Sequence, residues 1–202
     1  MTRTAFLNAG ACFAELVAAV PPGRWSAPGL GSWDVRALVG HACRALTTLT
    51  RYLDEPVPDV ACTNPGQYFV RSAEATTPEE VAARGVAAGN DLGEDPAATV
   101  RSALEQARAA LARFPMSEDP VIRTAAGGMR LSAYLPTRTF ELALHGLDLS
   151  AACGLDRRPP DHVLADAGRT AMQIADERGL TPEVLRALTG RGDLPEGFSL
   201  LG

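Results

Sequence analysis

Residues 135–153 read LPTRTFELALHGLDLSAAC, and this stretch decides which fold the chain can adopt. Its apolar side chains recur around most of the circumference of a helix, which is typical of a central helix buried by its neighbours. Four ionisable side chains interrupt this surface, namely Arg138, Glu141, His145 and Asp148. Their spacings of three, four and three residues place them on one line along the helix. Because buried ionisable groups are unfavourable unless they pair or bind a metal, this line predicts a partner.

The spacing of Glu141 and His145 is that of two ligands able to close on one metal ion from a single helix. Only three histidines occur in the chain, and His41 falls on the apolar stripe of a second predicted helix, 33–54. Three protein ligands would leave an open position, as in catalytic zinc sites. A second interpretation stays open, in which these groups only hydrogen-bond one another. The third histidine, His162, is expected at the surface.

Three further side chains are candidates for a role beside such a site. Asp148 or Arg138 could orient a ligand or balance its charge. Arg44 follows His41 by one helical turn, and Arg138 precedes Glu141 by one turn, so either could hold a substrate carboxylate or counter Glu141. An ordinary surface or structural ion pair is the alternative for each.

Apolar periodicity and helix-stop residues outline the rest of the chain. The expected fold is mostly all-α: a four-helix bundle with a small accessory β-hairpin and short C-terminal helices packed outside it. The bundle helices are predicted at 4–20, 33–54, 78–113 and 136–153, the second capped by Ser32 and the third kinked or divided. A hairpin is predicted at 121–132, turning at its glycines, and shorter helices are predicted at 67–72, 160–178 and 181–189.

Composition excludes several classes of protein. All 19 basic residues are arginine, so lysine-dependent chemistry such as a Schiff base or a P-loop is excluded. The net charge is -5 and the arginines are interleaved with acids, which argues against a nucleic-acid partner. No apolar run approaches the roughly 18 residues of a membrane span. The stretch near the N-terminus is shorter than the apolar region of a secretory signal, so we expect no export signal there and a cytoplasmic protein.

The cysteines lie at 12, 43, 62 and 153, without the spacing of a zinc motif, and are expected to be reduced thiols. Cys43 lies about 200° around the helix from His41, so it should point away from a metal there.

Two segments together resemble a known family. WSAPGLGSWDVRALVGHACRAL (Trp25 to Leu46) is similar to the first signature of mycothiol-dependent maleylpyruvate isomerase-like proteins, within the DinB-like group. RTFELALHGLDLSAACG (Arg138 to Gly154) resembles their second signature, Arg-x-x-Glu-x-x-x-His-x-x-Asp. LRALTGRGDLP (Leu185 to Pro195) resembles the usual end of this domain. The middle of the chain, 55–120, carries little signature.

The resemblance implies a DinB-like four-helix bundle with one divalent ion at one end of the core. Its ligands would map to His41, Glu141 and His145. Zn²⁺ is the expected metal, with Ni²⁺ or Fe²⁺ as alternatives. Residues 1–202 are expected to form one such domain, without the additional C-terminal domain of the full-length isomerase, and to act as a monomer or homodimer.

The expected activity is that of a metal-dependent thiol S-transferase or isomerase. The metal would favour the thiolate of a small thiol, expected to be mycothiol, for attack on a small electrophile. The alternative is a non-catalytic, metal-binding bundle that serves as a stress or regulatory interaction module.

Overall fold

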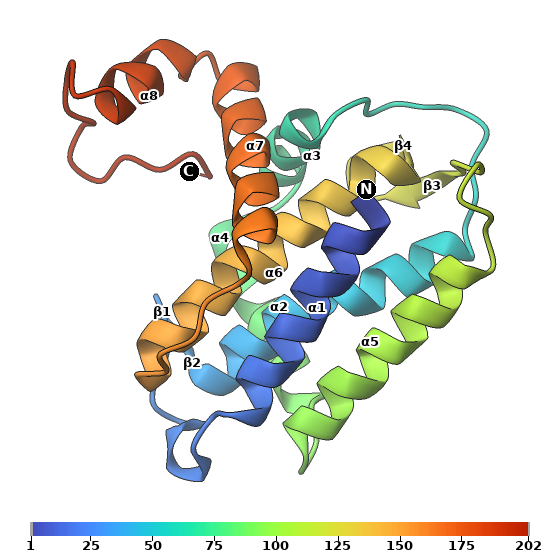
Figure 1. Ribbon diagram of the computed structural model, residues 1–202, viewed down its shortest axis with the longest axis vertical. Helices are drawn as coiled ribbons and strands as arrows, with labels where there is room; N and C mark the ends of the chain where they lie inside the picture. The colour runs from blue at the N-terminus through green and yellow to red at the C-terminus, as the bar shows by residue number, and fades with distance from the viewer. Residues whose placement is uncertain (1, 202) are drawn as a thin grey trace.

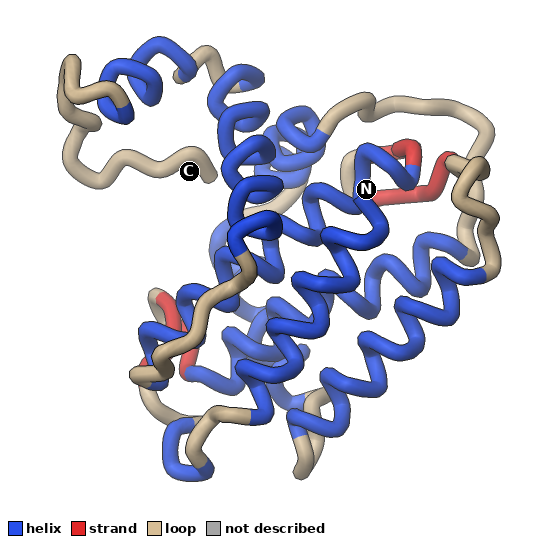
Figure 2. Tube along the Cα trace, viewed as in Figure 1, coloured by secondary structure: helices blue, strands red, loops and turns tan. Residues whose placement is uncertain are grey.

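The computed structural model describes residues 2–201 of the chain. In that range it holds eight α-helices, one short 3-10 helix and two small antiparallel sheets (Figures 1 and 2). The elements in chain order are α1 (Thr2–Ala18), η1 (Pro22–Arg24), β1 (Pro28–Leu30), β2 (Trp33–Asp34), α2 (Val35–Leu53), α3 (Pro65–Glu74), α4 (Pro78–Asn90), α5 (Pro96–Ala112), β3 (Val121–Thr124), β4 (Gly127–Arg130), α6 (Leu131–Cys153), α7 (Asp161–Glu177) and α8 (Thr181–Leu188).

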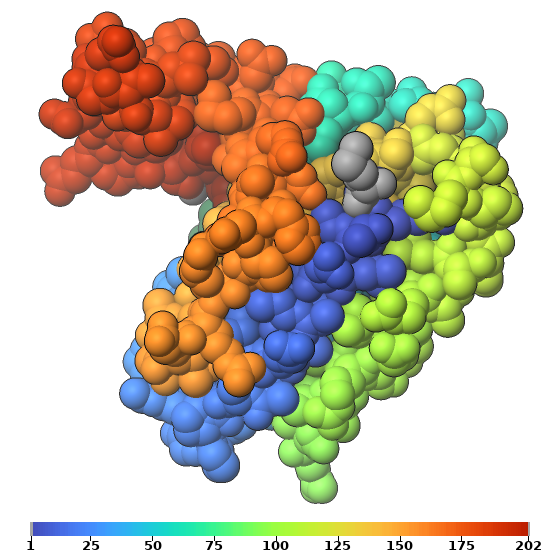
Figure 3. All heavy atoms as spheres, in the orientation of Figure 1, coloured from blue at the N-terminus to red at the C-terminus, as the bar shows by residue number. Residues whose placement is uncertain are grey.

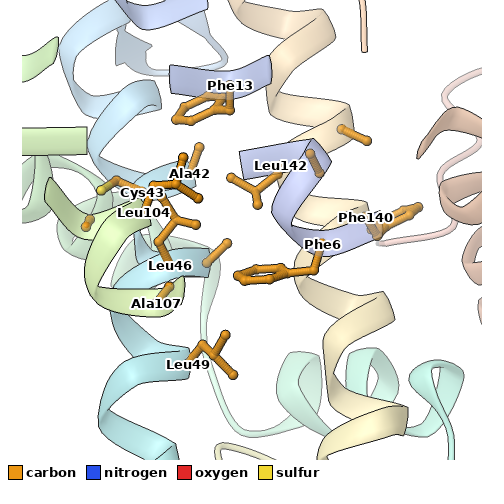
Figure 4. Packing of buried hydrophobic residues seen from close by; sticks show 14 of the residues in the cluster. Phe6, Phe13, Ala42, Cys43, Leu46, Leu49, Leu104, Ala107, Phe140 and Leu142 are labelled. Atoms are coloured by element: carbon orange, nitrogen blue, oxygen red, sulfur yellow. The ribbon is translucent and has the colours of Figure 1, made fainter. Parts of the chain in front are cut away.

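Helices α1, α2, α5 and α6 form a four-helix bundle, in which α1 and α2 each pack against both α5 and α6 (Figure 1). Each of the four helices contributes apolar side chains to the core that are nearly inaccessible to solvent (Figure 4). Examples, one from each helix, are Phe6, Leu46, Leu104 and Leu142. Burial of one such side chain stabilises the fold by about 1.5–3 kcal/mol. The prediction of a mostly helical bundle with an accessory hairpin is confirmed.

The third bundle helix is shorter than predicted. The chain breaks after Asn90, α5 joins the bundle, and α4 packs on the outside of α2. Glycines allow this close approach: a Cβ atom on Gly40 of α2 would overlap the backbone of Gly89 in α4. The alternative of two short helices over 78–113 is therefore confirmed, and only the placement of its first half in the bundle is wrong, because α4 uses its glycines for a contact outside the bundle.

The starts of two helices differ from the prediction. Asp34 caps α2, since its Oδ1 accepts a hydrogen bond from the Ala37 amide at 2.8 Å, so the prediction of Ser32 as the N-cap is wrong. Trp33 and Asp34 also form β2, which pairs with β1 in a sheet that the sequence did not predict. Helix α6 begins at Leu131, so Pro136 lies inside it and not at its start.

The predicted hairpin is confirmed as β3 and β4, which pair from Val121↔Arg130 to Thr124↔Gly127. The turn residues are Ala125 and Ala126, and Gly127, whose φ is +97°, closes the turn, so of the two glycines predicted for it only Gly127 takes part. Gly128 lies within β4, where a Cβ atom would overlap the carbonyl oxygen of Asp59.

The C-terminal helices lie outside the bundle. Helix α7 packs against α6, α3 and α1, while α8 contacts α7 and projects from the body of the molecule (Figure 3). The end of the tail returns to the body, where Leu201 lines the same cavity as His41. All four cysteines are free thiols. Among residues 2–201, no helix combines the length and apolar character that a membrane crossing requires.

Candidate metal centre

Three of the predicted site residues meet between α2 and α6. Oε2 of Glu141 lies 3.2 Å from Nε2 of His145 and 3.8 Å from Nε2 of His41. One donor atom from each of the three side chains lies within 4.8 Å of the other two. Two ligand atoms bound at about 2.1 Å to a tetrahedral ion are separated by about 3.4 Å. The spacing and the N, N, O donor set therefore fit one divalent ion.

Asp148 fixes the orientation of His145. Its Oδ2 lies 3.0 Å from Nδ1 of His145, while Nε2 of the same ring faces Glu141. Burial lowers the pKa of His145, but the contacts with Asp148 and Glu141 outweigh burial and raise that pKa to about 9. Metal binding would therefore displace a proton from this ring, which makes metal affinity dependent on pH.

Glu141 is held in the form that binds a cation. Burial raises the pKa of its carboxyl group, but the contacts with His145 and His41 and the charge of Arg138 hold the pKa well below its usual range. The carboxylate is thus ionised at neutral pH, as a metal ligand must be.

Stacking against Trp33 positions His41. The centroids of the two rings lie 4.5 Å apart with an interplanar angle of 33°. Nε1 of Trp33 donates a hydrogen bond to the carbonyl of Ala82 in α4 at 3.0 Å, which ties the indole to the neighbouring helix. Nδ1 of His41 is buried and has no hydrogen-bond partner within residues 2–201. Aromatic packing therefore orients this ring in place of the hydrogen bond that His145 has.

A cavity of about 430 Å³ opens beside the three side chains. It lies between α2, α3, α4 and α6, and both Arg44 and Arg138 line it. Asp148 is not part of its lining but reaches it through His145. The cavity gives a ligand of moderate size access to the open side of the donor set.

Tyr68 of α3 and Tyr134 of α6 also line or support this cavity, and sequence reasoning missed both. The guanidinium carbon of Arg138 is 5.0 Å from each ring centroid, and the two centroids are 5.7 Å apart, so the rings lie next to each other and not on opposite sides of the guanidinium. Tyr134 precedes Arg138 by four residues, so the helical spacing was a usable signal for it. Tyr68 lies in the middle segment that carried little signature, and only the tertiary fold brings it here.

The remaining candidates lie apart from this centre. His162 is exposed on α7, where its Nε2 lies 2.9 Å from Nδ2 of Asn8. Cys43 is buried in the core and points away from α6 (Figure 4). Burial raises the pKa of the Cys43 thiol to about 11, so it is protonated at neutral pH.

Comparison with known families gives one match. The sequence model described as "Mycothiol maleylpyruvate isomerase N-terminal domain" matches residues 6–150, which is more than half of the chain and includes all three donor residues. No curated protein and no solved structure matched. On the strength of that match, the chain belongs to the mycothiol maleylpyruvate isomerase N-terminal domain family.

Proposed function

We propose that this chain is a metal-dependent enzyme that uses a small thiol, mycothiol, to attack a small electrophile. The observation that carries the proposal is the convergence of His41, Glu141 and His145 at a cavity of about 430 Å³. The family match supports mycothiol as the thiol. Zinc is the proposed ion, because it accepts two imidazoles, a carboxylate and a thiolate.

The three protein ligands leave one position for the reacting thiol. When bound, the ion would supply a Lewis-acidic centre that favours the thiolate over the thiol at neutral pH. Glu141 is ionised, and His145 is held by Asp148 with Nε2 directed at the same point, so the protein presents a preorganised donor set. Trp33 covers His41 and restricts the approach of water from that side.

The proposed reaction needs no nucleophile from the protein. A sulfur lone pair forms the C–S bond, the π electrons of the electrophile move onto its carbonyl oxygen, and the proton lost by the thiol returns to the product. If the C–S bond breaks again after rotation about the former double bond, the result is cis–trans isomerisation. If it persists, the result is S-transfer.

Metal analysis with a matched pair of histidine variants tests this proposal. We expect one equivalent of zinc in the wild-type chain and in His162→Ala, which alters the exposed third histidine, and less than about one tenth of it in His41→Ala. With cobalt in place of zinc, addition of mycothiol should produce a sulfur-to-metal charge-transfer band. Zinc loading without any thiol response would favour the non-catalytic metal-binding module. Equal zinc content in His41→Ala and His162→Ala would contradict the proposal that His41 binds the metal.

A further inference from the structure

A second cavity adjoins the one beside the three donor residues. Its volume is about 690 Å³, and it lies between the β1–β2 turn, the start of α4 and the C-terminal tail. The two cavities have part of their lining in common, since Trp33, Val81 and Leu201 line both. A molecule bound near the donor residues can therefore extend into the second cavity, which we call the apolar groove.

Most side chains that line the apolar groove are hydrophobic. They include Leu30, Trp33, Pro78, Val81, Ala82 and Leu201. Leu30 and Leu201 are 39% and 44% exposed, so both offer apolar surface to a ligand. Among residues 2–201, no acid and no histidine lines the groove, and Arg178 is the one charged side chain in it. Such a surface favours an uncharged apolar group over a charged or strongly polar one.

The indole of Trp33 is a wall that the apolar groove shares with the metal centre. The ring of His41 packs against it at a centroid distance of 4.5 Å, and the same indole lines the groove. Its position is fixed, because Nε1 donates a hydrogen bond to the carbonyl of Ala82 at 3.0 Å. A group held in the groove therefore lies close to a donor residue without occupying the position of the metal.

The C-terminal tail closes one side of the apolar groove. Residues 191–197 are exposed, whereas Leu200 is partly buried and packs against the core. Nη2 of Arg178 donates a hydrogen bond to the carbonyl of Leu201 at 3.2 Å. This bond holds Leu201 at the place where the groove and the metal cavity meet.

We propose that the apolar groove binds an uncharged apolar group of the electrophile, such as an aromatic ring or a branched alkyl chain, while the reactive carbon lies in the metal cavity. The assignment to the electrophile rests on the proposed function. Mycothiol fits the groove poorly, because its sugar and cyclitol hydroxyls would lose water there and find few partners. Only Ser32 and Thr76 offer hydroxyl groups in the lining.

The neutral dye N-phenyl-1-naphthylamine tests the groove on metal-free protein. The dye fluoresces strongly only in apolar surroundings and carries no carboxylate or thiol. We expect saturable binding to the wild type, and binding weaker by about tenfold or more in Leu30→Glu, which places a charge in the groove. The matched control is Leu188→Glu on α8, where the leucine is 73% exposed and outside the groove, and it should leave the affinity unchanged.

A second variant fills the groove without touching the donor residues. Ala82 lines the groove but not the metal cavity, so Ala82→Phe should weaken dye binding by about tenfold or more and leave the zinc content unchanged. Ala87→Phe, at an exposed position of the same helix, is its control. The proposal would be overturned by undiminished dye affinity in Leu30→Glu or Ala82→Phe, or by the absence of saturable binding to the wild type.

Two unsaturated amides test whether the groove accepts an electrophile. Cinnamamide and crotonamide carry the same uncharged reactive group, but the first has a phenyl ring where the second has a methyl group. On metal-free protein without thiol, cinnamamide should displace the dye at a concentration at least about tenfold lower than crotonamide. Ala82→Phe should remove this preference. Equal displacement by the two amides, or a preference that persists in Ala82→Phe, would contradict the assignment.

Two other occupants would be recognised by different results. In zinc-loaded protein, mycothiol should leave the dye bound, and displacement would assign the groove to the thiol. A dimer in sedimentation velocity that dissociates when the dye is added would assign the groove to a second copy of the chain. Either result would overturn the proposal. Failure of the proposed function would appear separately, as absent zinc or thiol binding in the wild type, and would leave dye binding to metal-free protein intact.

Discussion

Two faces of helix α6 differ in their surroundings, although Glu141 on one face and Leu142 on the other are adjacent in sequence. Leu142 is 1% exposed and lies with side chains of α1, α2 and α5 in an apolar core (Figure 4). On the opposite face, Arg138, Glu141 and His145 line a cavity with more hydrogen-bonding groups than the protein satisfies. The first face is packed without gaps for a ligand, whereas the second is the face on which we propose that a ligand binds.

We therefore expect substitutions on the core face, which includes Leu142, and on the cavity face, which includes Arg138, Glu141 and His145, to change different properties of the protein. Removing apolar volume from the core face should destabilise the fold without changing the donor set. Removing a polar group from the cavity face should change metal or ligand affinity more than it changes the free energy of unfolding, because burying those groups already disfavours folding.

The largest expected effect is on the core face. Leu46→Ala removes a side chain that is 0% exposed, and should lower the free energy of unfolding by about 2–5 kcal/mol. Leu147→Ala on α6 is the matched control, since this leucine is 37% exposed, and its effect should stay below about 1 kcal/mol. Urea denaturation of the metal-free variants measures both free energies of unfolding. Equal losses in Leu46→Ala and Leu147→Ala would show that packing of the bundle core does not dominate the stability of the fold.

Zinc should stabilise the folded chain through the cavity face. At a free zinc concentration 100 times the dissociation constant, the gain in unfolding free energy is about 2.7 kcal/mol. Glu141→Gln keeps the shape of the side chain but removes its charge, and should lose most of this gain. Thermal unfolding with and without zinc measures the effect, and a gain of the same size in Glu141→Gln would place the bound ion elsewhere.

The helices of the bundle could be predicted because the sequence signals that define them lie within each helix and at its ends. Apolar periodicity and terminating residues such as Gly154, whose φ is +65°, locate the helices within a few residues. The errors arise where tertiary contacts decide. Trp33 and Asp34 pair with β1 and so move the cap of α2, and β4 runs directly into α6 and thus places Pro136 inside that helix.

The donor residues could be nominated from sequence because Glu141 and His145 share a helix, and His41 is the one other histidine on an apolar stripe. The sequence could not provide what surrounds Arg138, since Tyr68 comes from a distant helix. Nor could it provide the contact of Trp33 with His41, which depends on α4 packing closely on α2.

Asp148→Asn should weaken zinc binding by about 10- to 100-fold without affecting the core face. The amide removes the charge that holds Nδ1 of His145, which lies 3.0 Å from the Asp148 carboxylate. Asp166→Asn on α7 alters an exposed ion pair with Arg169 and is the matched control. Competition with a chromogenic chelator gives the zinc affinities, and an undiminished value in Asp148→Asn would assign this aspartate a role in packing alone.

A smaller effect is expected from the contact that orients His41. In Gly85→Ala, the added Cβ atom would lie 2.5 Å from Trp33 and must displace the indole. Zinc affinity should fall by about 2- to 10-fold, which is the range of an aromatic contact. Gly168→Ala on α7 adds the same methyl group with no atom within 4 Å and should leave zinc affinity unchanged. Equal affinities in the two variants would mean that stacking does not position His41.

The smallest effect is expected at Cys43, which lies two residues from His41 but belongs to the core face of α2. Burial raises the pKa of its thiol to about 11, and the side chain points away from α6, so it neither ionises near neutral pH nor reaches the donor set (Figure 4). Cys43→Ala should therefore leave zinc affinity within about twofold of the wild type and lower stability only by the small volume removed. Thiol titration at pH 8 should show Cys43 reacting more slowly in the folded chain than the partly exposed Cys12. A large loss of zinc affinity in Cys43→Ala would instead indicate that this sulfur binds the metal, and Cys43 would then belong to the metal site and not to the core side of α2.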